Sequence, residues 1–309
     1  MTTPGRSQNS EFDARHEPVL VREVIALLQP RSDGTYVDCT VGLGGHAAAM
    51  LAAGAGRVIA LDRDAGALAR TATRLADAGS RLELVHADYR DLPRVLAERG
   101  LTAVDGVLAD LGVSSWQLDD PARGFSFRMN GPLDMRMDPS KGPTVAELIA
   151  TTDESTLADI IYEYGEERHA RRVARSIVRA RERGPLVETS ALASIVRGAA
   201  GGRGWQRIDP ATRTFQALRI WVNRELEGLD TFVESAVASL RAGGRLAVIA
   251  FHSLEDRIVK HTLRRLVDAE ETYRMITRKP IRPDDTEVAH NARARSARLR
   301  AVEKAVAIA

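Results

Sequence analysis

Residues 35–46 read Thr-Tyr-Val-Asp-Cys-Thr-Val-Gly-Leu-Gly-Gly-His, and this stretch decides the fold. An apolar segment typical of a buried strand ends at Asp38 and leads into a glycine-rich turn, after which alanines predict a helix. The glycines of this turn are Gly42, Gly44 and Gly45. A second apolar segment, residues 57–61, ends at Asp62. This order predicts a pocket for a nucleotide-type ligand, because backbone N–H groups at the helix start can approach it.

Apolar segments continue to alternate with helical patterns, and four of them end at or next to an aspartate. These aspartates are Asp38, Asp62, Asp88 and Asp110. The alternation predicts an α/β fold with a doubly wound, mostly parallel sheet, whose ligands bind at the carboxyl ends of the strands. A single aspartate at a strand end is usually a turn residue, so it is the repetition that favours a site.

The composition is that of an ordinary globular chain. It has 309 residues, of which 44% are hydrophobic and 28% charged, and a net charge of +2. Its one cysteine, Cys39, excludes an internal disulfide, and no apolar run approaches the ~20 residues of a membrane span. We therefore expect a cytoplasmic protein without a membrane partner. Residues 1–14 are expected to form a disordered tip.

The strand pattern stops after Asp110. Residues 111–138 form a long segment rich in glycine, serine and aspartate, which we interpret as part of a site wall or a lid. Helical patterns then dominate, so residues 139–208 are predicted to be an inserted helical domain that recognises RNA. The sheet domain is predicted to be discontinuous, with residues 15–138 and 209–309.

Arginines gather on one face of the helix predicted at residues 168–183. They are Arg168, Arg171, Arg172, Arg175 and Arg179. This face is either a solvated surface or a contact for RNA phosphates, and Arg213 on a later predicted helix could join it. The basic tail at residues 291–300 is either a last edge strand or an RNA-contacting extension.

A late strand at residues 245–251 has no charge after its first residue and ends at His252. Ser253 and Asp256 are predicted to form a capping box for the helix that follows.

The glycine turn alone leaves two cofactors open. Gly42–Ala47 fits the dinucleotide pattern, and Asp62 follows Gly42 by 20 residues, so a nicotinamide-dependent dehydrogenase is an alternative. S-adenosylmethionine fits the other residues better, with its ribose on Asp62, its adenine beside Tyr89, and its amino-acid part near Asp38 and the turn. An RNA-binding module without catalysis is a third possibility.

Longer stretches carry a specific resemblance. They are His16-Glu-Pro-Val-Leu20, Gly44-Gly-His46, Asp110-Leu-Gly-Val-Ser-Ser115, Gln117-Leu-Asp-Asp120, Gly124-Phe-Ser-Phe127, Gly131-Pro-Leu-Asp-Met-Arg-Met-Asp138, Tyr164-Gly-Glu-Glu-Arg168, Ala211-Thr-Arg-Thr-Phe-Gln216 and Phe251-His-Ser-Leu-Glu-Asp-Arg-Ile-Val-Lys260. From about residue 15 to 300, the chain resembles the bacterial 16S rRNA (cytosine-N4)-methyltransferases, the RsmH or MraW family. Trp116 departs from the family pattern, and Tyr89 stands where relatives can carry Phe.

This resemblance implies a Rossmann-like class I S-adenosylmethionine-dependent methyltransferase. The implied reaction moves a methyl group to the exocyclic N4 of a cytidine in the decoding region of 16S rRNA and leaves S-adenosylhomocysteine. The implied partner is the small ribosomal subunit, no metal is expected, and the protein is a monomer or a homodimer. The resemblance also implies cofactor contacts, namely Gly44, Gly45 and His46 at the methionine end, Asp62 at the ribose, Tyr89 by the adenine, and Asp110 and Gln117 closing the pocket.

The N4 amine is a poor nucleophile, so the site must position it and accept its proton. We expect Asp110 with Ser114 and Ser115 to lie near N4, and His252 is a second candidate. The aromatic side chains of the long segment either stack on the displaced base or pin the segment to the core. They are Trp116, Phe125 and Phe127.

Overall fold

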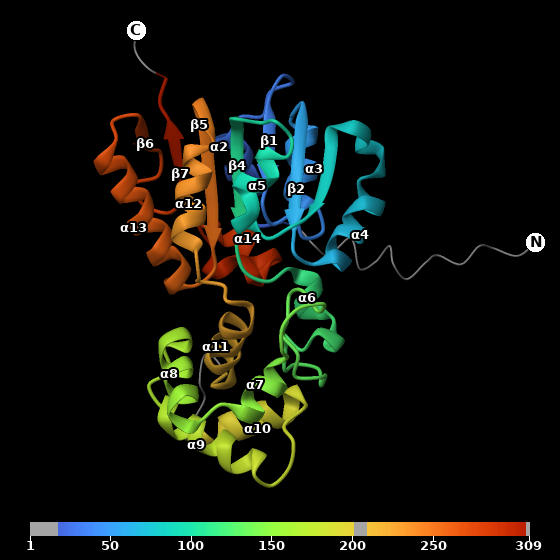
Figure 1. Ribbon diagram of the computed structural model, residues 1–309, viewed down its shortest axis with the longest axis vertical. Helices are drawn as coiled ribbons and strands as arrows, with labels where there is room; N and C mark the ends of the chain where they lie inside the picture. Colours follow the sequence, from blue (N-terminus) through green and yellow to red (C-terminus); the bar gives the residue numbers. More distant parts are fainter. Residues whose placement is uncertain (1–17, 201–208, 307–309) are drawn as a thin grey trace, which may run out of the picture. The chain divides into compact units, whose positions relative to one another are not determined.

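The computed structural model describes residues 18–200 and 209–306 (Figure 1). The predicted tip, residues 1–14, lies outside the described residues. The chain divides into two compact units, Met1–Gly112 with Gly228–Ala309, and Val113–Glu227. We call them the sheet unit and the helical unit. The helical unit extends beyond the predicted insertion, residues 139–208, at both ends.

The sheet unit contains seven strands in the order β3-β2-β1-β4-β5-β7-β6. They are β1 (Thr35–Asp38), β2 (Arg57–Asp62), β3 (Leu82–His86), β4 (Val104–Asp110), β5 (Leu240–Ala250), β6 (Tyr273–Met275) and β7 (Arg298–Lys304). The first five are parallel, and β7 is antiparallel to both of its neighbours. The predicted α/β fold with a mostly parallel sheet is confirmed.

The basic tail does not form an edge strand. β7 lies inside the sheet between β5 and β6. Its central residues, Leu299 to Val302, are buried, and the Arg300 guanidinium is paired with Asp256 of α13 (Ser253–Ala269). Only residues 298–300 of the predicted tail belong to this strand, while Ala292–Ser296 forms a 3-10 turn, and β6 rather than β7 is the last strand at this side of the sheet.

Helices cover both faces of the sheet (Figure 1). They are α2 (Val21–Leu28), α3 (Gly45–Ala52), α4 (Ala65–Arg74), α5 (Leu92–Ala97), α12 (Leu229–Ala238), α13 (Ser253–Ala269) and α14 (Asp285–His290), with short 3-10 turns at Ala76–Arg81, Tyr89–Asp91 and Ala292–Ser296. Side chains alternate between two cores, because successive residues of a strand point to opposite faces. Ile59 joins the core under α5, α12 and α13, whereas Val58 and Ala60 join the core under α2, α3 and α4.

The helical unit has its own hydrophobic core. Its helices are α6 (Ser115–Asp119), α7 (Val145–Thr151), α8 (Glu154–Gly165), α9 (Ala170–Arg181), α10 (Thr189–Ala200) and α11 (Ala211–Asn223), with a 3-10 turn at Pro121–Arg123. The long segment before α7 contributes Phe125, Leu133, Met135 and Met137 to this core. Asn223 of α11 also holds the long segment in place, since its side chain accepts the Met137 N–H and donates to the Met135 carbonyl, both at 2.7 Å.

Across the described part of the chain, no helix is both long and apolar enough to cross a lipid bilayer.

Candidate active site

The glycine turn follows β1 and bends sharply before α3. Gly42 and Gly44 have φ angles of +52° and +80°, a region that glycine enters at little cost. A side chain on Gly45 would stand 2.7 Å from Pro18, so the chain before α2 packs directly on the turn. Gly44 is the N-cap of α3 and offers no capping side chain. The first N–H groups of α3 therefore have no side-chain cap from this residue and can serve a ligand.

Asp62 shapes this turn. Its carboxylate accepts the N–H groups of Gly42 and Asp64, both at 2.8 Å. Burial raises the pKa of Asp62 to about 6, and the two N–H donors oppose that rise. Each carboxylate oxygen keeps a further lone pair, which suits it to the predicted ribose contact.

Tyr89 is buried at the end of β3, where an adenine is expected. Its ring lies 4.8 Å from that of Phe232, and the guanidinium of Arg90 lies 5.6 Å from its centre. Asp88 beside it accepts Arg90 through both oxygens, at 2.7 and 2.8 Å. The aromatic ring is therefore held in place by packing and by a neighbouring ion pair.

His46 is buried in the first turn of α3. Its Nε2 atom lies 3.0 Å from the carbonyl oxygen of Val19, and burial lowers its pKa to about 4, so the ring is neutral at physiological pH. With Pro18 against Gly45, this contact fastens the segment before α2 to the glycine turn. The contact to Val19 was not foreseen, because it joins residues 27 positions apart. The predicted cofactor contact of His46 stays a prediction.

Three neighbouring strands end in buried polar atoms that lack a hydrogen-bond partner in the described structure. They are Oδ2 of Asp38, the last residue of β1, Oδ1 of Asp110, the last residue of β4, and Nε2 of His252, which follows β5. Buried polar groups are nearly always hydrogen-bonded, so three such atoms at adjacent strand ends mark a place where a ligand supplies partners. The predicted residues Asp38, Asp110 and His252 are thus brought to one edge of the sheet.

The two aspartates of this group hold protons unusually well. Burial raises the pKa of Asp38 to about 7, against the pull of the Thr40 N–H, with a further contribution from Asp62. Burial also raises the pKa of Asp110 well above its ordinary value, and the charges of Asp38 and Glu255 add to the rise.

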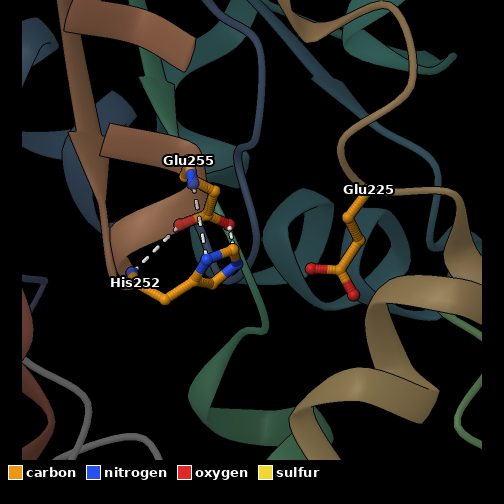
Figure 2. A group of neighbouring side chains, drawn as sticks. All are labelled: Glu225, His252 and Glu255. Carbon is orange, nitrogen blue, oxygen red and sulfur yellow. Dashed lines mark hydrogen bonds and ion pairs between the residues drawn. The ribbon is translucent and has the colours of Figure 1, made fainter. Parts of the chain in front are cut away.

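His252 faces Glu255, a residue that the sequence analysis missed (Figure 2). The Glu255 carboxylate accepts the N–H groups of Phe251 and His252 at 2.8 and 3.3 Å, while Nδ1 of His252 accepts the Glu255 N–H at 3.4 Å. Nε2 lies 3.1 Å from the Glu255 carboxylate, but without the geometry of a hydrogen bond. His252 thus caps α13, and this role competes with the predicted catalytic one.

The predicted capping box of Ser253 and Asp256 is wrong by one residue. The strand end places His252 at the N-cap, so Glu255 is the third helical residue and completes the box. Asp256 instead binds Arg300 of β7 at 2.6 Å.

Ser114, Ser115 and Gln117 lie in the helical unit. The Ser114 hydroxyl accepts the Gln117 N–H at 3.3 Å, and the Gln117 side chain accepts the Ser114 N–H at 3.0 Å, which makes a capping box for α6. Ser115 is the first residue of that helix. The box explains why Gln117 is buried, and the predicted contacts of these residues with cofactor or substrate stay predictions.

The aromatic residues of the long segment pack within the helical unit. Phe125 is buried in its core, and Phe127 meets Phe215 edge to face at 4.7 Å. Arg123 lies over the ring of Trp116 at 5.1 Å. For Phe125 and Phe127, these contacts support the interpretation that they pin the segment.

The predicted arginine face is present on α9. The helix buries Ala170, Val173, Ala174 and Ile177. Four of the predicted arginines lie on this helix and are exposed, namely Arg171, Arg172, Arg175 and Arg179. Arg168 is also exposed but precedes the helix, because α9 begins at Ala170 and not at residue 168 as predicted. Arg175 pairs with Glu154 at 3.2 Å, and Arg172 donates to the Ala200 carbonyl at 2.7 Å. Arg213 on α11 lies 3.8 Å from the buried Glu167.

These features define a class. The glycine turn after β1, the acid that ends β2 and the aromatic residue after β3 lie at the carboxyl ends of a doubly wound sheet, where such sheets bind nucleotide-type ligands. The sheet order departs from the dinucleotide-binding order 3-2-1-4-5-6, because an antiparallel β7 is inserted between β5 and β6. The chain therefore has the fold of a Rossmann-like class I methyltransferase.

The chain belongs to the MraW methylase family, whose model matches residues 13–305. It is 53% identical to "Ribosomal RNA small subunit methyltransferase H" of Sorangium cellulosum, over 94% of this chain and 91% of that protein. It is 50% identical to proteins of the same name from Nitrobacter winogradskyi (96% of this chain, 92% of that one) and Anaeromyxobacter sp. strain K (94% and 98%). The predicted family and enzyme class, an S-adenosylmethionine-dependent methyltransferase, are confirmed.

Proposed function

We propose that this protein transfers the methyl group of S-adenosylmethionine to the exocyclic N4 of a cytidine in the decoding region of 16S rRNA. The observation that carries the proposal is the two buried carboxylate oxygens, on Asp38 and Asp110, that have no hydrogen-bond partner in the described structure. An exocyclic amine brings N–H donors, and a carboxylate oxygen without a partner is a suitable acceptor for them. Family membership supports the same reaction.

The residues of the sheet unit fit the cofactor. The N–H groups at the start of α3 and the glycine turn would hold its amino-acid part, Asp62 its ribose and Tyr89 its adenine. The glycine turn is held rigidly by packing, because a side chain on Gly44 or Gly45 would collide with Thr71 or Pro18. The fit to the cofactor is supported by the start of α3, where the N-cap Gly44 offers no capping side chain. When bound, the cofactor supplies a methyl carbon made electrophilic by the adjacent sulfonium.

Asp110 is the proposed acceptor for N4. Its Oδ1 atom can take a hydrogen bond from the amine and so orient the nitrogen lone pair toward the methyl carbon. As the C–N bond forms, the amine becomes acidic, and the same carboxylate can remove its proton. We assign His252 a lesser part, because its Nδ1 atom and its carboxylate neighbour are engaged in capping α13. Ser114 and Ser115 remain proposed acceptors for N4.

We further propose that the helical unit binds the rRNA backbone through its arginine face. Guanidinium groups pair with phosphates, and the apolar side of α9 anchors the face to a folded core. Arg213 is proposed to join this contact.

The reaction is tested by nucleoside analysis after incubation with methyl-labelled S-adenosylmethionine. One arm uses naked 16S rRNA and the other uses the assembled small subunit, so the same experiment identifies the substrate form. We expect label in N4-methylcytidine at one position in at least one arm. Label in another nucleoside, or no label in either arm, would contradict the proposal.

The RNA contact is tested by Arg171→Glu combined with Arg179→Glu, which leaves the Arg175–Glu154 pair intact. We expect RNA affinity to fall about tenfold or more and its log–log salt slope to flatten by about 1–2, because each phosphate contact contributes about 0.7–0.9. The matched control is Arg264→Glu, at an exposed position on α13. Equal effects of the two changes would show that general charge, not the arginine face, binds RNA.

A further inference from the structure

The ends of β1 and β4 carry two buried carboxyl groups tied to one threonine. The Thr40 N–H donates to Oδ1 of Asp38 at 3.2 Å, and the Asp110 N–H donates to the Thr40 hydroxyl oxygen at 2.6 Å. The strands are neighbours in register, with Asp38 opposite Leu108. Thr40 thus holds the two strand ends together and fixes the backbone from which both carboxyl groups project.

Neither carboxyl group has a cation beside it. In the described structure, Asp38 and Asp110 form no ion pair with lysine or arginine, and Asp38 Oδ2 and Asp110 Oδ1 have no hydrogen-bond partner. The groups that act on them electrostatically are acidic: Asp62 on Asp38, and Glu255 on Asp110, with the Cys39 thiol also near Asp38. His252 lies on the α13 side next to Glu255. Two buried carboxylates without a cation cannot both ionise at little cost, since each ion loses several kcal/mol of hydration.

We propose that Asp38 and Asp110 hold one proton between them in the free protein, release it when the sulfonium cation of S-adenosylmethionine binds, and regain it from N4. This inference rests on the proposed function for the last step only. Asp110 is the catalytic member, because it touches the amine, and Asp38 is a positioning residue that acts through the charge it shares with Asp110. The sulfonium is the cation that the pair lacks.

The proton balance closes over one turnover. Cofactor binding sends the shared proton to solvent and leaves two carboxylates beside one sulfonium. The N4 lone pair then forms the C–N bond, the C–S bond breaks with its electron pair going to sulfur, and the N4 proton passes to Asp110. The uncharged thioether of S-adenosylhomocysteine leaves a pair that again carries one proton. The reaction's proton is therefore released at cofactor binding and not at methyl transfer.

The test is the number of protons released on binding, measured by calorimetry in buffers of different ionisation enthalpy. S-adenosylmethionine and S-adenosylhomocysteine are compared on the full chain near pH 7. They share every group except the charged methyl-sulfonium, so the difference between them isolates that charge. We expect S-adenosylmethionine to release more, with the difference approaching one proton, and the affinity ratio of the two ligands to change by up to about tenfold per pH unit.

Variants locate the proton. Asp38→Asn and Asp110→Asn are expected to abolish the difference between the ligands, whereas Asp230→Asn, at an exposed position on α12, is expected to keep it. A role of Asp38 in cofactor binding alone would weaken both ligands equally and leave the proton difference unchanged. Equal proton release by the two ligands on the wild-type chain overturns the proposal without needing any variant to fold, as does a difference that survives both Asn variants.

Failure of the proposed function would look different. If rRNA is not methylated but the proton difference depends on both aspartates, the substrate assignment is wrong and the proton pair stands. If rRNA is methylated and the two ligands release equal numbers of protons, the pair is wrong and the function stands.

Discussion

β4 carries two aspartates, Asp105 and Asp110, whose surroundings are opposite. Asp105, near the start of the strand, accepts Arg31 at 2.7 Å, Arg241 at 2.9 Å and the Thr35 N–H at 2.7 Å. Asp110, at the end of the strand, has a buried oxygen with no partner in the described structure. On the same strand, Asp105 therefore stabilises the fold through its ion pairs, whereas the Asp110 carboxyl group has no cation beside it in the described structure.

Other acids near the amino ends of the parallel strands resemble Asp105. At the amino ends of the parallel strands, Glu83 is shared by Arg57 and Arg99, each at 2.6 Å. Glu303 is likewise shared by Arg245 and Arg274, at 2.7 and 2.8 Å. At the carboxyl ends the acids differ, because Asp88 accepts Arg90 at 2.7 Å, whereas no lysine or arginine pairs with Asp38 or Asp110 among the described residues. A cationic ligand would therefore supply charge balance at the ends of β1 and β4, where the described part of the chain supplies none.

The largest effect is expected from Asp110→Asn. Removing the proposed proton acceptor should lower the rate of methyl transfer about 10²-fold or more. The fold should persist, because the substitution removes a buried carboxylate that has no cation beside it. Single-turnover methylation and thermal unfolding measure the two effects. Near-normal turnover of the variant would show that Asp110 does not accept the N4 proton.

Asp38→Asn should change stability in a pH-dependent way. Burial raises the folded-state pKa of Asp38 to about 7, from about 4 in an unfolded chain. The folded protein then binds the proton more tightly, so the stability due to this group is complete below about pH 4 and is lost as the pH rises through about 7. Asparagine does not titrate, so the variant should gain about 2–4 kcal/mol on the wild type between pH 4 and pH 8. Urea unfolding at both pH values checks this, and parallel curves for the two proteins would contradict it.

Asp105→Asn should destabilise the protein by about 2 kcal/mol at neutral pH, because two arginines and one N–H lose a charged acceptor. We discount the loss because both arginines are partly exposed. Methyl transfer at a temperature where the variant is folded should be unchanged. The matched control is Asp33→Asn, which changes an exposed acid before β1. An equal loss of unfolding free energy in both variants would contradict the stabilising role of Asp105.

Glu83→Gln should have the smallest effect, about 1 kcal/mol or less, since the carboxylate is partly exposed. Burial raises the pKa of Glu83, but the hydrogen bonds from Arg99 and Arg57 outweigh burial and hold this pKa below its ordinary value. Its contribution is therefore present above the unfolded-state pKa and is lost as the pH falls, the reverse of Asp38. Unfolding between pH 3 and pH 6 should show the wild-type advantage shrink toward acid, and an advantage that grew toward acid would contradict the contrast.

Much of the fold was predictable because its signals are local. The apolar segments before Asp38, Asp62 and Asp110 indicate parallel strands, and the glycines after Asp38 indicate the turn. The arginines of α9 were placed on the correct face by helical periodicity alone. Asp38, Asp110 and His252 were found because each lies at or just after the end of a strand, and parallel strands bring their ends to one edge.

The remaining features depend on long-range contacts or on one-residue boundaries. Glu255 was missed because β5 ends one residue earlier than the pattern suggests, which moves the helix cap from Ser253 to His252. The partners of Asp105 and the Val19 contact of His46 join residues distant in sequence, and no periodicity reports them. Phe125 looked equally suited to a base and to a core, and only the fold of the helical unit decides where it packs.

The placement of the helical unit within the chain has a consequence for synthesis on the ribosome. β5 pairs with β4, yet the 115 residues of Val113–Glu227 and all of α12 are made between them. The helical unit is continuous and can fold as it emerges, whereas β4 stays an unpaired edge until Leu240–Ala250 appears. At ~5–20 residues per second this interval is on the order of ten seconds. An apolar strand edge exposed for that long invites pairing with other chains, so the nascent protein is most vulnerable to aggregation in this interval.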